Sequence, residues 1–537
     1  MSGTDATART FARRVAGRAR RALRGPAHAP TPVRPGRTPP DVWARRVATL
    51  VRALEADGSG GVPAAGLDPD ARLRRLLTGA GDDRIWLALA VLSGRLPEPA
   101  QVVAARRAAR TGGPQAVLDA ARAATTAASA GREVEVLHGR TLVDMGDLVL
   151  FPLGTGIQRV ARQVGRAWRD GHDVTAVAWT PELDALRALS DAERDAALDG
   201  LDAPPTVTPE DGARSTAVQV VVPWGGTYLL PELAIQPQRC AALHGLAEHS
   251  PTRCGVIGFD LVPVTSAETS AEGFAAVFAL NLAAVAEFDA VAAISRAAAT
   301  EYEGWRRMLS GAGLTGPQVT AVQLPAHAPM PTDADLAEAR DRFTVAGWPL
   351  VLCVGSHEPR KNHLAVLHAA ELLWRRGHRF TVTFVGGNSW NSDAFNRRLG
   401  ELQGAGRPVE AVSRLDDRLL WAAYRVAHCS VFPSLNEGFG LPVAESIAAG
   451  TPALASDFGS MREIAAHGGA LLVDPRDDHS VADGLERLLT DPELYARLAS
   501  EAAAVPETSW EDYAEQVWDV LHGTAAPDRV GPGPAHE

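Results

Sequence analysis

The chain has 537 residues and a mass of 56.6 kDa, which is too long for one ordinary hydrophobic core and predicts two or three domains. Its hydrophobic content of 46% and charged content of 22% are typical of a globular protein. A formal net charge of −11 and an isoelectric point near 5.8 exclude the strongly basic character of a dedicated nucleic-acid-binding protein. We therefore expect no nucleic-acid partner.

Residues 1–40 are predicted to form a basic, disordered tail. They contain nine arginines, many prolines and a single acidic residue, Asp5. A solvated tail is the simpler interpretation. The alternative is that residues 9–37 contact an anionic membrane surface, because clustered arginines are attracted to acidic headgroups.

Residues 41–130 have the pattern of helices. Trp43, Val47, Leu50, Val51 and Leu54 recur at the spacing of one helical face, and further apolar runs follow. No arrangement of residues suited to chemistry is found in this segment, so we predict a helical prefix with a structural or docking role. We also expect residues 131–523 to fold without it.

From residue 131 onward, apolar valine-rich segments alternate with amphipathic ones. Residues 131–330 contain TLVDMG, DVTAVAW, TAVQVVVPW, CGVIGFDLVPV, AVAAIS and QVTAVQLPA, with a polar, aspartate-rich insertion at 181–214. Residues 331–507 contain LVLCVGS, FTVTFVGG, PVEAVS, CSVFPS, TPALAS and ALLVD. Continuous apolar strands alternating with helices predict parallel sheets covered on both faces. The fold class is therefore α/β, with two doubly wound domains, then a closing helix and a disordered tail in 508–537.

The cysteines indicate a reducing compartment. Cys240, Cys254, Cys353 and Cys429 lie far apart, and the last two fall inside apolar strands. Buried, reduced thiols are the favoured interpretation, and they predict a cytoplasmic protein. The most apolar long stretch, at 274–294, contains Asn, Glu and Asp residues and is interpreted as a helix leading into a strand rather than a membrane span.

The segment GSHEPRKNH, residues 355–363, leaves one predicted strand and enters a helix. In open α/β sheets ligands bind at this end of the strands. Arg360 offers a planar fork for two phosphate oxygens, whereas Lys361 offers a compact charge on a flexible stem. Lys361 is the only lysine in a chain with 53 lysines and arginines. This pair predicts a diphosphate site where a second arginine would not fit.

The segment CSVFPSLNEGFGLPVAESIAAG, residues 429–450, is predicted to be a strand, a glycine loop and a short helix opened by Pro442. Gly438 and Gly440 permit close approach of a ligand to the backbone, and a helix N-terminus favours an anion. Glu437 and Glu445 lie beside this anion site. Because carboxylates repel phosphate, we expect these two to accept hydrogen bonds from sugar and ribose hydroxyls.

Together these segments resemble a known family. The loop EPRKN and the E-x7-E pattern of EGFGLPVAE are similar to those of family 4 retaining glycosyltransferases, the group 1 glycosyl transferases of the GT-B fold. The resemblance extends over residues 131–523. TGIQRVARQVGRAW, at 155–168, resembles the glycine loop and helix of a bacterial subgroup that builds surface polysaccharides. GFDLVPV, at 258–264, resembles the family's acidic segment that faces the acceptor.

The resemblance implies roles for particular residues. Catalysis would depend on Arg360 and Lys361, which would bind the donor diphosphate, and on Glu437, which would contact the donor sugar. Glu445 would accept a hydrogen bond from the ribose. The other donor-binding positions implied are Gly355, Gly438, Phe439, Gly440 and Leu441.

On the acceptor side, the resemblance implies that Gly156 lines the cleft opposite the phosphates and that Asp260 lies near the acceptor. Phe259 precedes Asp260 where many family members have a histidine, which leaves a histidine contact to the acceptor unsupported.

The reaction implied is sugar transfer with retention of configuration, from a nucleoside-diphosphate sugar to a glycan or lipid-linked glycan. Mannose and a deoxyhexose are the sugars that the subgroup suggests. No further cofactor and no metal are implied, and the Asp-x-Asp stretches at 68–70 and 333–335 are interpreted as solvated turns. The alternatives are another GT-B sugar reaction, such as that of an epimerase or a phosphorylase, and a non-catalytic scaffold. The protein would be cytoplasmic, and peripheral at the inner face of the membrane if residues 9–37 contact lipid.

Overall fold

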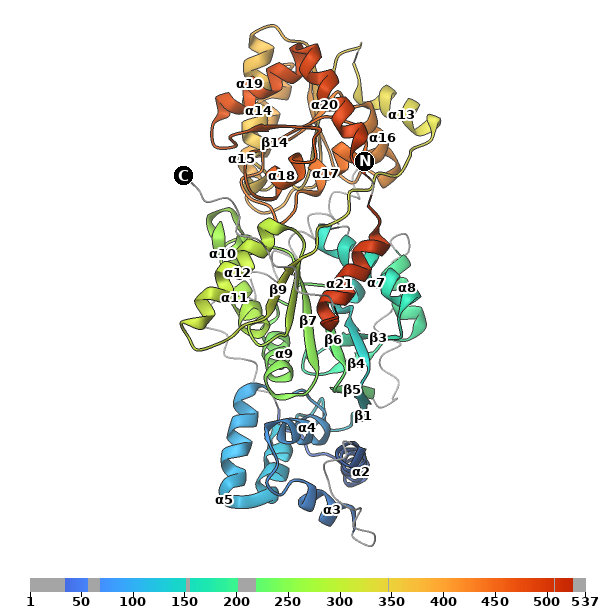
Figure 1. Cartoon of the computed structure of the whole chain (residues 1–537), viewed down its shortest axis with the longest axis vertical. Helices are drawn as coiled ribbons and strands as arrows, with labels where there is room; N and C mark the ends of the chain where they lie inside the picture. Colours follow the sequence, from blue (N-terminus) through green and yellow to red (C-terminus); the bar gives the residue numbers. More distant parts are fainter. Residues whose placement is uncertain are drawn as a thin grey trace.

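A computed structural model describes residues 34–56, 68–150, 155–200, 219–345, 347–506 and 508–524. Three parts follow one another along the longest axis of the molecule, namely a helical prefix, a domain around a nine-stranded sheet and a domain around a six-stranded sheet (Figure 1). Most of the predicted basic tail, residues 1–33, lies outside the described residues. Among the helices of the described ranges, none has the length and apolar character needed to cross a bilayer.

The helices of the prefix begin and end at residues that are common helix caps. Asp68 caps one helix by accepting a hydrogen bond from the amide of Ala71, and Gly94 ends another in the left-handed conformation at φ 69°. The bounds are α2 Pro40–Ala56, α3 Pro69–Leu76, α4 Asp82–Ser93 and α5 Pro99–Ala124.

The prefix and the first sheet share one hydrophobic core. Residues from both belong to the same buried cluster, and Trp86 of α4 stacks on Trp224 of β5 (Gln219–Trp224) with ring centroids 6.5 Å apart. Arg46, 1% exposed, donates to the carbonyls of Leu92, Ser129 and Arg132. Removing the prefix would expose this apolar surface. The structure therefore opposes the expectation that residues 131–523 fold alone.

We predict that a chain lacking residues 1–130 is insoluble or unfolds at a much lower temperature, whereas one lacking residues 1–33 melts like the full chain. The reason is the loss of the shared core, where burying one large apolar side chain contributes about 1.5–3 kcal/mol. Solubility, size-exclusion chromatography and thermal unfolding of the two truncations check this. A monomeric 131–537 fragment with a cooperative, unshifted transition would contradict it.

The first sheet has the strand order β1-β5-β4-β3-β2-β6-β7-β8-β9. Its other strands are β1 Glu133–His138, β2 Thr141–Asp144, β3 Val174–Trp179, β4 Leu186–Ala188, β6 Thr227–Leu230, β7 Arg253–Gly258, β8 Ala290–Ala293 and β9 Gln318–Ala321. The helices of this domain are α6 Gly146–Leu150, α7 Gly156–Gly171, α8 Asp191–Asp199, α9 Pro237–His249, α10 Val262–Thr265, α11 Phe274–Val285 and α12 Arg296–Ser310. The stretch at 274–294 is the helix and strand that the sequence predicts, α11 and β8.

The prediction of wholly parallel sheets is wrong at β4. This strand is antiparallel to both β3 and β5. It follows β3 after only six residues, which is too short for a parallel crossover, and Leu183 turns the chain with φ 57°. The predicted polar insertion at 181–214 thus begins with a hairpin strand and continues into α8, while residues 201–218 lie outside the described residues.

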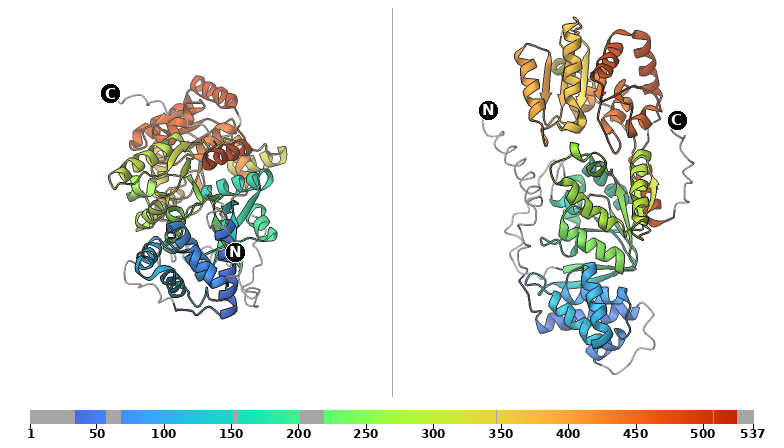
Figure 2. Two further views of the ribbon diagram at one scale, coloured as in Figure 1. Left: turned by 60° about the horizontal axis from the view of Figure 1, so that its bottom comes forward. Right: turned by 90° about the vertical axis from the view of Figure 1, so that its left-hand side faces the viewer.

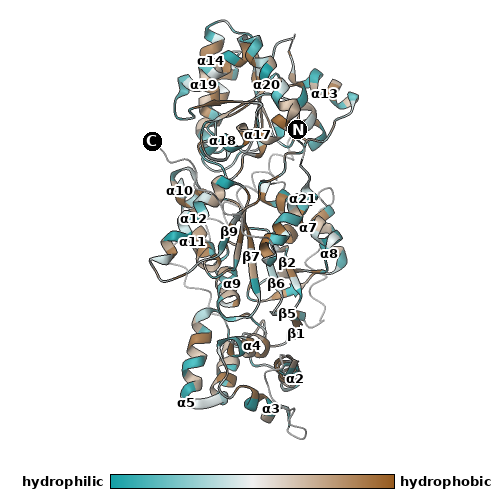
Figure 3. Ribbon diagram, in the orientation of Figure 1, coloured by the Kyte–Doolittle hydropathy of each residue, from teal (hydrophilic) through white to brown (hydrophobic). Residues whose placement is uncertain are grey.

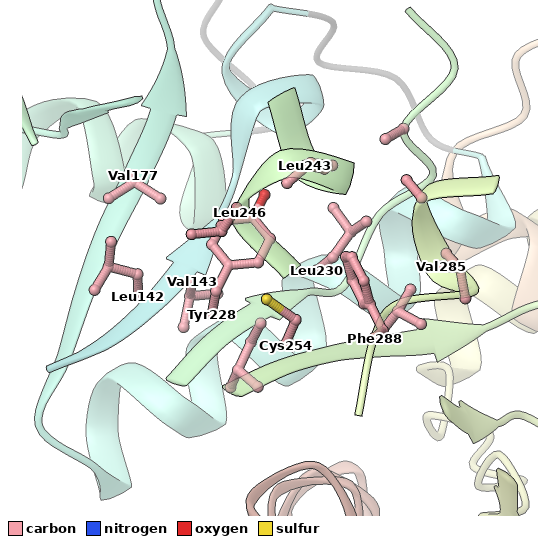
Figure 4. Packing of buried hydrophobic residues seen from close by; sticks show 14 of the residues in the cluster. Leu142, Val143, Val177, Tyr228, Leu230, Leu243, Leu246, Cys254, Val285 and Phe288 are labelled. Atoms are coloured by element: carbon pink, nitrogen blue, oxygen red, sulfur yellow. The ribbon is translucent and has the colours of Figure 1, made fainter. Parts of the chain in front are cut away.

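Both faces of the central strands are buried, as their continuous apolar runs predict. Figure 4 shows Tyr228 and Cys254 from neighbouring strands close to Leu246 of α9, and Leu142 beside Val177. In Figure 3 the inner strands carry hydrophobic colour, whereas the outer helices alternate between hydrophobic and hydrophilic residues. All four cysteines are buried and free, which confirms the prediction of reduced thiols.

The second sheet is parallel throughout, in the order β12-β11-β10-β13-β14-β15. Its strands are β10 Leu350–Val354, β11 Thr381–Val385, β12 Val409–Val412, β13 Cys429–Phe432, β14 Ala453–Ser456 and β15 Ala470–Val473. The helices are α13 Asp333–Phe343, α14 His363–Arg375, α15 Asp393–Gly404, α16 Asp417–Val426, α17 Leu441–Ala448, α18 Gly459–Ala465, α19 Asp478–Thr490 and α20 Pro492–Ala504.

The last described helix, α21 Trp510–His522, returns to the first domain and lies beside α7 (Figures 1 and 2). Trp168 of α7 donates to the carbonyl of Ala514 at 2.9 Å, and Arg253 donates to that of Leu521 at 2.7 Å. Segments that follow strands of both sheets contact each other across the domain interface, for example Ser295 after β8 and Gly438 after β13. The predicted fold class, two doubly wound α/β domains with their ligand-binding ends facing each other, is confirmed.

Candidate active site

The loop 355–363 lies directly after β10, at the carboxyl end of the second sheet. Gly355 has φ 145°, and residues Pro359–Lys361 form one 3-10 turn. Asn362 takes the left-handed conformation with φ 56° just before α14. The carbonyl of Arg360 accepts a hydrogen bond from the amide of Leu435 at 2.9 Å, so this loop is tied to the segment after β13. The two sequence motifs are therefore brought together.

Arg360, Lys361 and Glu437 form one buried charge cluster. Lys361 Nζ lies 2.5 Å from Glu437 Oε1, and Arg360 Nη1 lies 2.5 Å from Glu437 Oε2. The side chains are 12%, 14% and 9% exposed for Lys361, Arg360 and Glu437. Ser434 also donates to Glu437 at 2.7 Å, and Arg360 NH2 donates to Glu358 at 2.6 Å. Each carboxylate oxygen of Glu437 thus has a cationic partner.

The electrostatics of this cluster differ from the sequence-based expectation. Burial raises the pKa of Glu437, but the charges of Arg360 and Lys361 outweigh burial and hold this pKa at about 2. Arg360 keeps a raised pKa despite its own burial, because Glu437, Glu358 and Asp260 surround it. Glu437 is therefore an anion that pairs with both cations. The sequence motif predicts only that Glu437 accepts hydrogen bonds from hydroxyls.

The glycine loop lies against the first domain. A Cβ added to Gly438 would lie 2.2 Å from the carbonyl oxygen of Phe259, so only glycine fits there. Gly440, with φ 104°, is the N-cap of α17, and Pro442 follows in the first turn. Phe439 is buried at 4% exposure, and Leu441 is the first residue of the helix. The N-terminus of α17 therefore lies at the domain interface, as the motif predicts.

Glu445 is the fifth residue of α17 and is already paired. Its Oε1 accepts a hydrogen bond from Arg159 Nη1 of α7 at 2.5 Å, and its Oε2 accepts one from the Tyr424 hydroxyl of α16 at 3.0 Å. Burial raises its pKa, while Arg159 and Tyr424 counteract this effect. Arg159 belongs to the TGIQR segment of the first domain, so this contact joins the two domains.

The first-domain residues predicted for the site also lie at the interface. Gly156 begins α7, and a Cβ added there would lie 3.6 Å from Leu441 Cδ1. Asp260 follows β7, and a Cβ added to Gly438 would lie 3.1 Å from its Oδ2. The pKa of Asp260 is raised to about 6, mainly by burial. The positive charge of Arg360 lowers this pKa, whereas the negative charges of Glu437 and Glu301 raise it further. A half-buried carboxyl with a raised pKa therefore lies beside the charge cluster.

We predict that the Asp260→Asn variant gains stability relative to the wild type as the pH rises from about 4 to about 6. The pKa of Asp260 is raised from 3.8 to about 6, so the unfolded chain loses this proton first and the native wild type loses stability across that window. Asn has no proton to lose in this range. The difference in free energy of unfolding between the two proteins should therefore change by about 1–3 kcal/mol. Denaturant unfolding of both proteins at pH 4.5, 5.5 and 7 measures it. A pH-independent difference would contradict the prediction.

Several contacts at the interface were missed by the sequence analysis. Ser295 donates to the carbonyl of Gly438 at 2.6 Å, and Asn436 donates to Glu301 at 3.3 Å. Glu463 of α18 accepts from the amides of Arg296 and Ala297, capping α12 from the other domain. Of the side chains that make these contacts, only that of Asn436 lies in a segment with a recognisable motif, the one at 429–450, whereas Ser295, Glu301 and Glu463 lie outside every motif of the sequence.

The Asp-x-Asp stretches are helix starts rather than solvated turns. Asp68 caps α3, and Asp335 shares a capping box with Thr332 at the start of α13. Neither follows a strand. Within the described ranges, no group of three or more His, Cys, Asp or Glu side chains is placed to hold a metal ion.

Comparison with known proteins agrees with this geometry. Residues 338–505 match the family model for glycosyl transferases group 1. A serotype-specific mannosyltransferase WbdA of Escherichia coli is 27% identical over 339 residues, which are 61% of this chain and 40% of that protein. A D-inositol 3-phosphate glycosyltransferase of Frankia alni is 38% identical over 178 residues, 31% of this chain and 44% of that protein. The chain thus spans less than half the length of these relatives.

Solved structures show the same fold. The Anabaena protein HepE, in complex with UDP and glucose, has a TM-score of 0.52 at 15% identity over 72% of this chain and 100% of its own. Sucrose-phosphate synthase from Thermosynechococcus elongatus has a TM-score of 0.50 at 18% identity over 72% of this chain and 99% of its own. The chain therefore has the GT-B fold, and its residues 338–505 are similar to the glycosyl transferases group 1.

Proposed function

We propose that the chain is a glycosyltransferase that moves a sugar from a nucleoside-diphosphate sugar to a glycan or lipid-linked glycan acceptor, with retention of configuration. The observation that carries the proposal is the position of Arg360 and Lys361. Two cations, about one-eighth exposed, lie beside a glycine loop and a helix N-terminus at the domain interface. Such a set of donors suits a diphosphate.

In this mechanism the second domain stabilises the leaving group. Negative charge develops on the diphosphate as the bond to the sugar breaks, and Arg360, Lys361 and the amides of Gly438, Phe439 and Gly440 would stabilise it. The phosphates would bind the two cations that pair with Glu437, and Glu437 would then accept hydrogen bonds from the donor sugar. Asp260 would lie on the acceptor side. The chemistry assigned to these residues needs no metal ion.

The relatives favour mannose as the sugar. Serotype-specific mannosyltransferases and an O-antigen chain mannosyltransferase B of Escherichia coli are among the similar proteins. A role in building a bacterial surface polysaccharide fits these names, with a growing glycan as the acceptor. A deoxyhexose is the second candidate. The cytoplasm, where nucleotide sugars are made, would be its compartment.

The test is release of a nucleoside diphosphate by the full chain, with GDP-mannose, UDP-glucose and a dTDP-deoxyhexose as donors and an acceptor panel. Transfer with unchanged anomeric configuration, insensitive to EDTA, is the expected result. Inversion of configuration would refute retention, and loss of activity with EDTA that Mg²⁺ restores would refute metal independence. Tight donor binding without release would favour the scaffold, and an altered free sugar would favour the epimerase-like alternative.

We also propose that residues 9–37 bring the protein to an anionic membrane. The nine arginines of residues 1–40 with one acid motivate this prediction, since each arginine near such a surface adds about 1 kcal/mol. Deleting residues 1–33 should reduce cosedimentation with vesicles of 30 mol% phosphatidylglycerol at low salt, and leave transfer to a soluble acceptor unchanged. Equal cosedimentation of both proteins would refute the proposal.

A further inference from the structure

The two glutamates of the E-x7-E motif are both neutralised, but from different domains. Glu437 is paired with Arg360 and Lys361 of its own domain. Glu445 lies in the second domain, and its cationic partner, Arg159, comes from the first. The distance between Arg159 Nη1 and Glu445 Oε1 is 2.5 Å, and the Glu445 side chain is 9% exposed. A buried carboxylate of the second domain therefore depends on the first domain for its counter-charge.

The surrounding residues hold Arg159 in this position. Gly156 starts α7 against Leu441, so Arg159, one turn further on, faces α17. Its guanidinium lies 5.6 Å from the ring centroid of Trp421, at the distance of a cation–π contact. The domains are also joined at other points, for example where Ser295 donates to Gly438. Arg159, whose side chain is 34% exposed, is thus held by the Trp421 contact as well as by its ion pair.

The pairing leaves Glu445 able to bind a ligand. A carboxylate has about four lone-pair sites on its two oxygens. Arg159 uses one site on Oε1 and Tyr424 uses one on Oε2, which leaves a site on each oxygen. Two neighbouring hydroxyls, as on a ribose, match this remaining capacity. Arg159 would therefore orient the carboxylate and keep it charged without blocking it.

We propose that Arg159 is a positioning residue, supplied by the first domain, for recognition of the donor ribose by Glu445. The proposal rests on the proposed function, in which Glu445 accepts from the ribose of a nucleoside-diphosphate sugar. It makes the nucleoside site a joint product of both domains, complete only when α7 lies against α17. Tight binding of the nucleoside and closure of the domains would then be coupled, because each domain supplies one half of the same ion pair.

The experiment is calorimetric titration of the full chain with ADP, GDP and UDP, and then with the 2′-deoxy and 3′-deoxy forms of whichever binds. The variants are Arg159→Gln, Arg159→Lys, Glu445→Gln and the double variant Arg159→Gln/Glu445→Gln. The matched control is Arg166→Gln, because Arg166 is on the same helix and pairs with Asp199 at 2.9 Å away from α17. Circular dichroism and melting curves establish that each variant is folded.

We expect Arg159→Gln to weaken binding of the ribonucleotide by roughly ten- to a hundredfold, the value of a hydrogen bond to a charged group. Arg159→Lys should recover part of this loss, and Arg166→Gln should bind like the wild type. The wild type should prefer the ribonucleotide to its deoxy forms, and Arg159→Gln should have lost this preference. The double variant should bind like Glu445→Gln alone, because Arg159 acts through that carboxylate.

Other outcomes overturn the inference. Unchanged binding by Arg159→Gln, or an undiminished preference for the ribose hydroxyls, would show that the ion pair only joins the domains. Additive losses in the double variant would mean that Arg159 contacts the nucleotide directly. If Arg159→Gln is unstable, the same comparisons between Arg159→Lys and the wild type decide the matter. A wild type that binds none of the nucleotides would refute the proposed function itself, which is a different result from binding that Arg159 does not affect.

Discussion

Replacing Glu437 with Gln is expected to reduce turnover by roughly a hundredfold while leaving affinity for a nucleoside diphosphate equal or higher. Gln keeps the shape of the side chain but removes the charge that holds Lys361 and Arg360 in place. A misplacement of catalytic groups by about 1 Å can cost a hundredfold in rate. The phosphates, by contrast, no longer compete with a carboxylate for the two cations. Steady-state kinetics and calorimetric titration measure the two effects separately.

The same substitution should also change stability in a ligand-dependent way. Removing one partner from a buried ion pair costs about 3–5 kcal/mol, because the remaining charges stay buried and unpaired. A nucleoside diphosphate supplies the missing negative charge, so it should raise the melting temperature of Glu437→Gln more than that of the wild type. A smaller rise than in the wild type would contradict the view that Glu437 stands in for phosphate.

The chain offers a matched control in Asp184. This carboxylate is also 9% exposed and pairs with two arginines, Arg95 and Arg132, each at 2.7 Å. It lies where the prefix meets the first sheet, away from the glycine loop. Asp184→Asn should lose stability for the same reason, but the nucleoside diphosphate should not restore it. The comparison distinguishes the general cost of losing a buried ion pair from the loss of a pair whose cations are also proposed to bind phosphate.

Local patterns explain why the fold and one half of the site could be predicted. The strands of the second domain are continuous apolar runs. The loop after β10 and the glycine loop are each one unbroken segment of the sequence, so the residues of each loop can be recognised without knowledge of their contacts. Gly438 illustrates the limit. The sequence predicts that this glycine lets a ligand approach the backbone, and the structure shows that it also lets the backbone of Phe259 approach.

The contacts between domains could not be predicted in the same way. Arg159 and Glu445 are 286 residues apart, and an arginine on an amphipathic helix is ordinarily a solvated residue. The Tyr424 hydroxyl that completes the site belongs to another helix whose apolar face gave no sign of a polar partner. β4 was missed because a three-residue strand in a polar insertion has too few residues to show a period. Such features depend on how separate elements meet.

The second large effect is expected at Lys361. Lys361→Met keeps an unbranched apolar side chain beside Phe432, whose ring centroid lies 5.0 Å from Nζ, and removes only the charge. It should lose a charge-assisted interaction worth about 1.5–3 kcal/mol, which is roughly a ten- to hundredfold loss in kcat/KM. Because Nζ also pairs with the buried Glu437, we expect a loss of stability as well, more than a solvent-exposed loop lysine would cause.

Lys361→Arg distinguishes a need for charge from a need for a compact charge. A Cβ added to Gly355 would lie 3.8 Å from Lys361 Cδ, so the side chain runs close to the backbone of the loop, and Arg360 already presents one guanidinium to Glu437. A second planar fork would have to share that space. We therefore expect at least several-fold impairment of kcat/KM, and wild-type kinetics for Lys361→Arg would show that charge alone is required.

Because Lys361 is the only lysine, its reactivity can be measured without mutation. Reductive methylation can modify only the chain's α-amino group and Lys361, and mass spectrometry of the peptides resolves the two. A bound nucleoside diphosphate should slow methylation of Lys361, since its ammonium group then contacts phosphate, and leave the α-amino group unaffected as an internal control. Equal slowing at both amines would mean a general effect of the ligand on the reagent. Unchanged methylation of Lys361 in the saturated complex would remove the ammonium group from the diphosphate site, and the lysine would then serve only to neutralise Glu437.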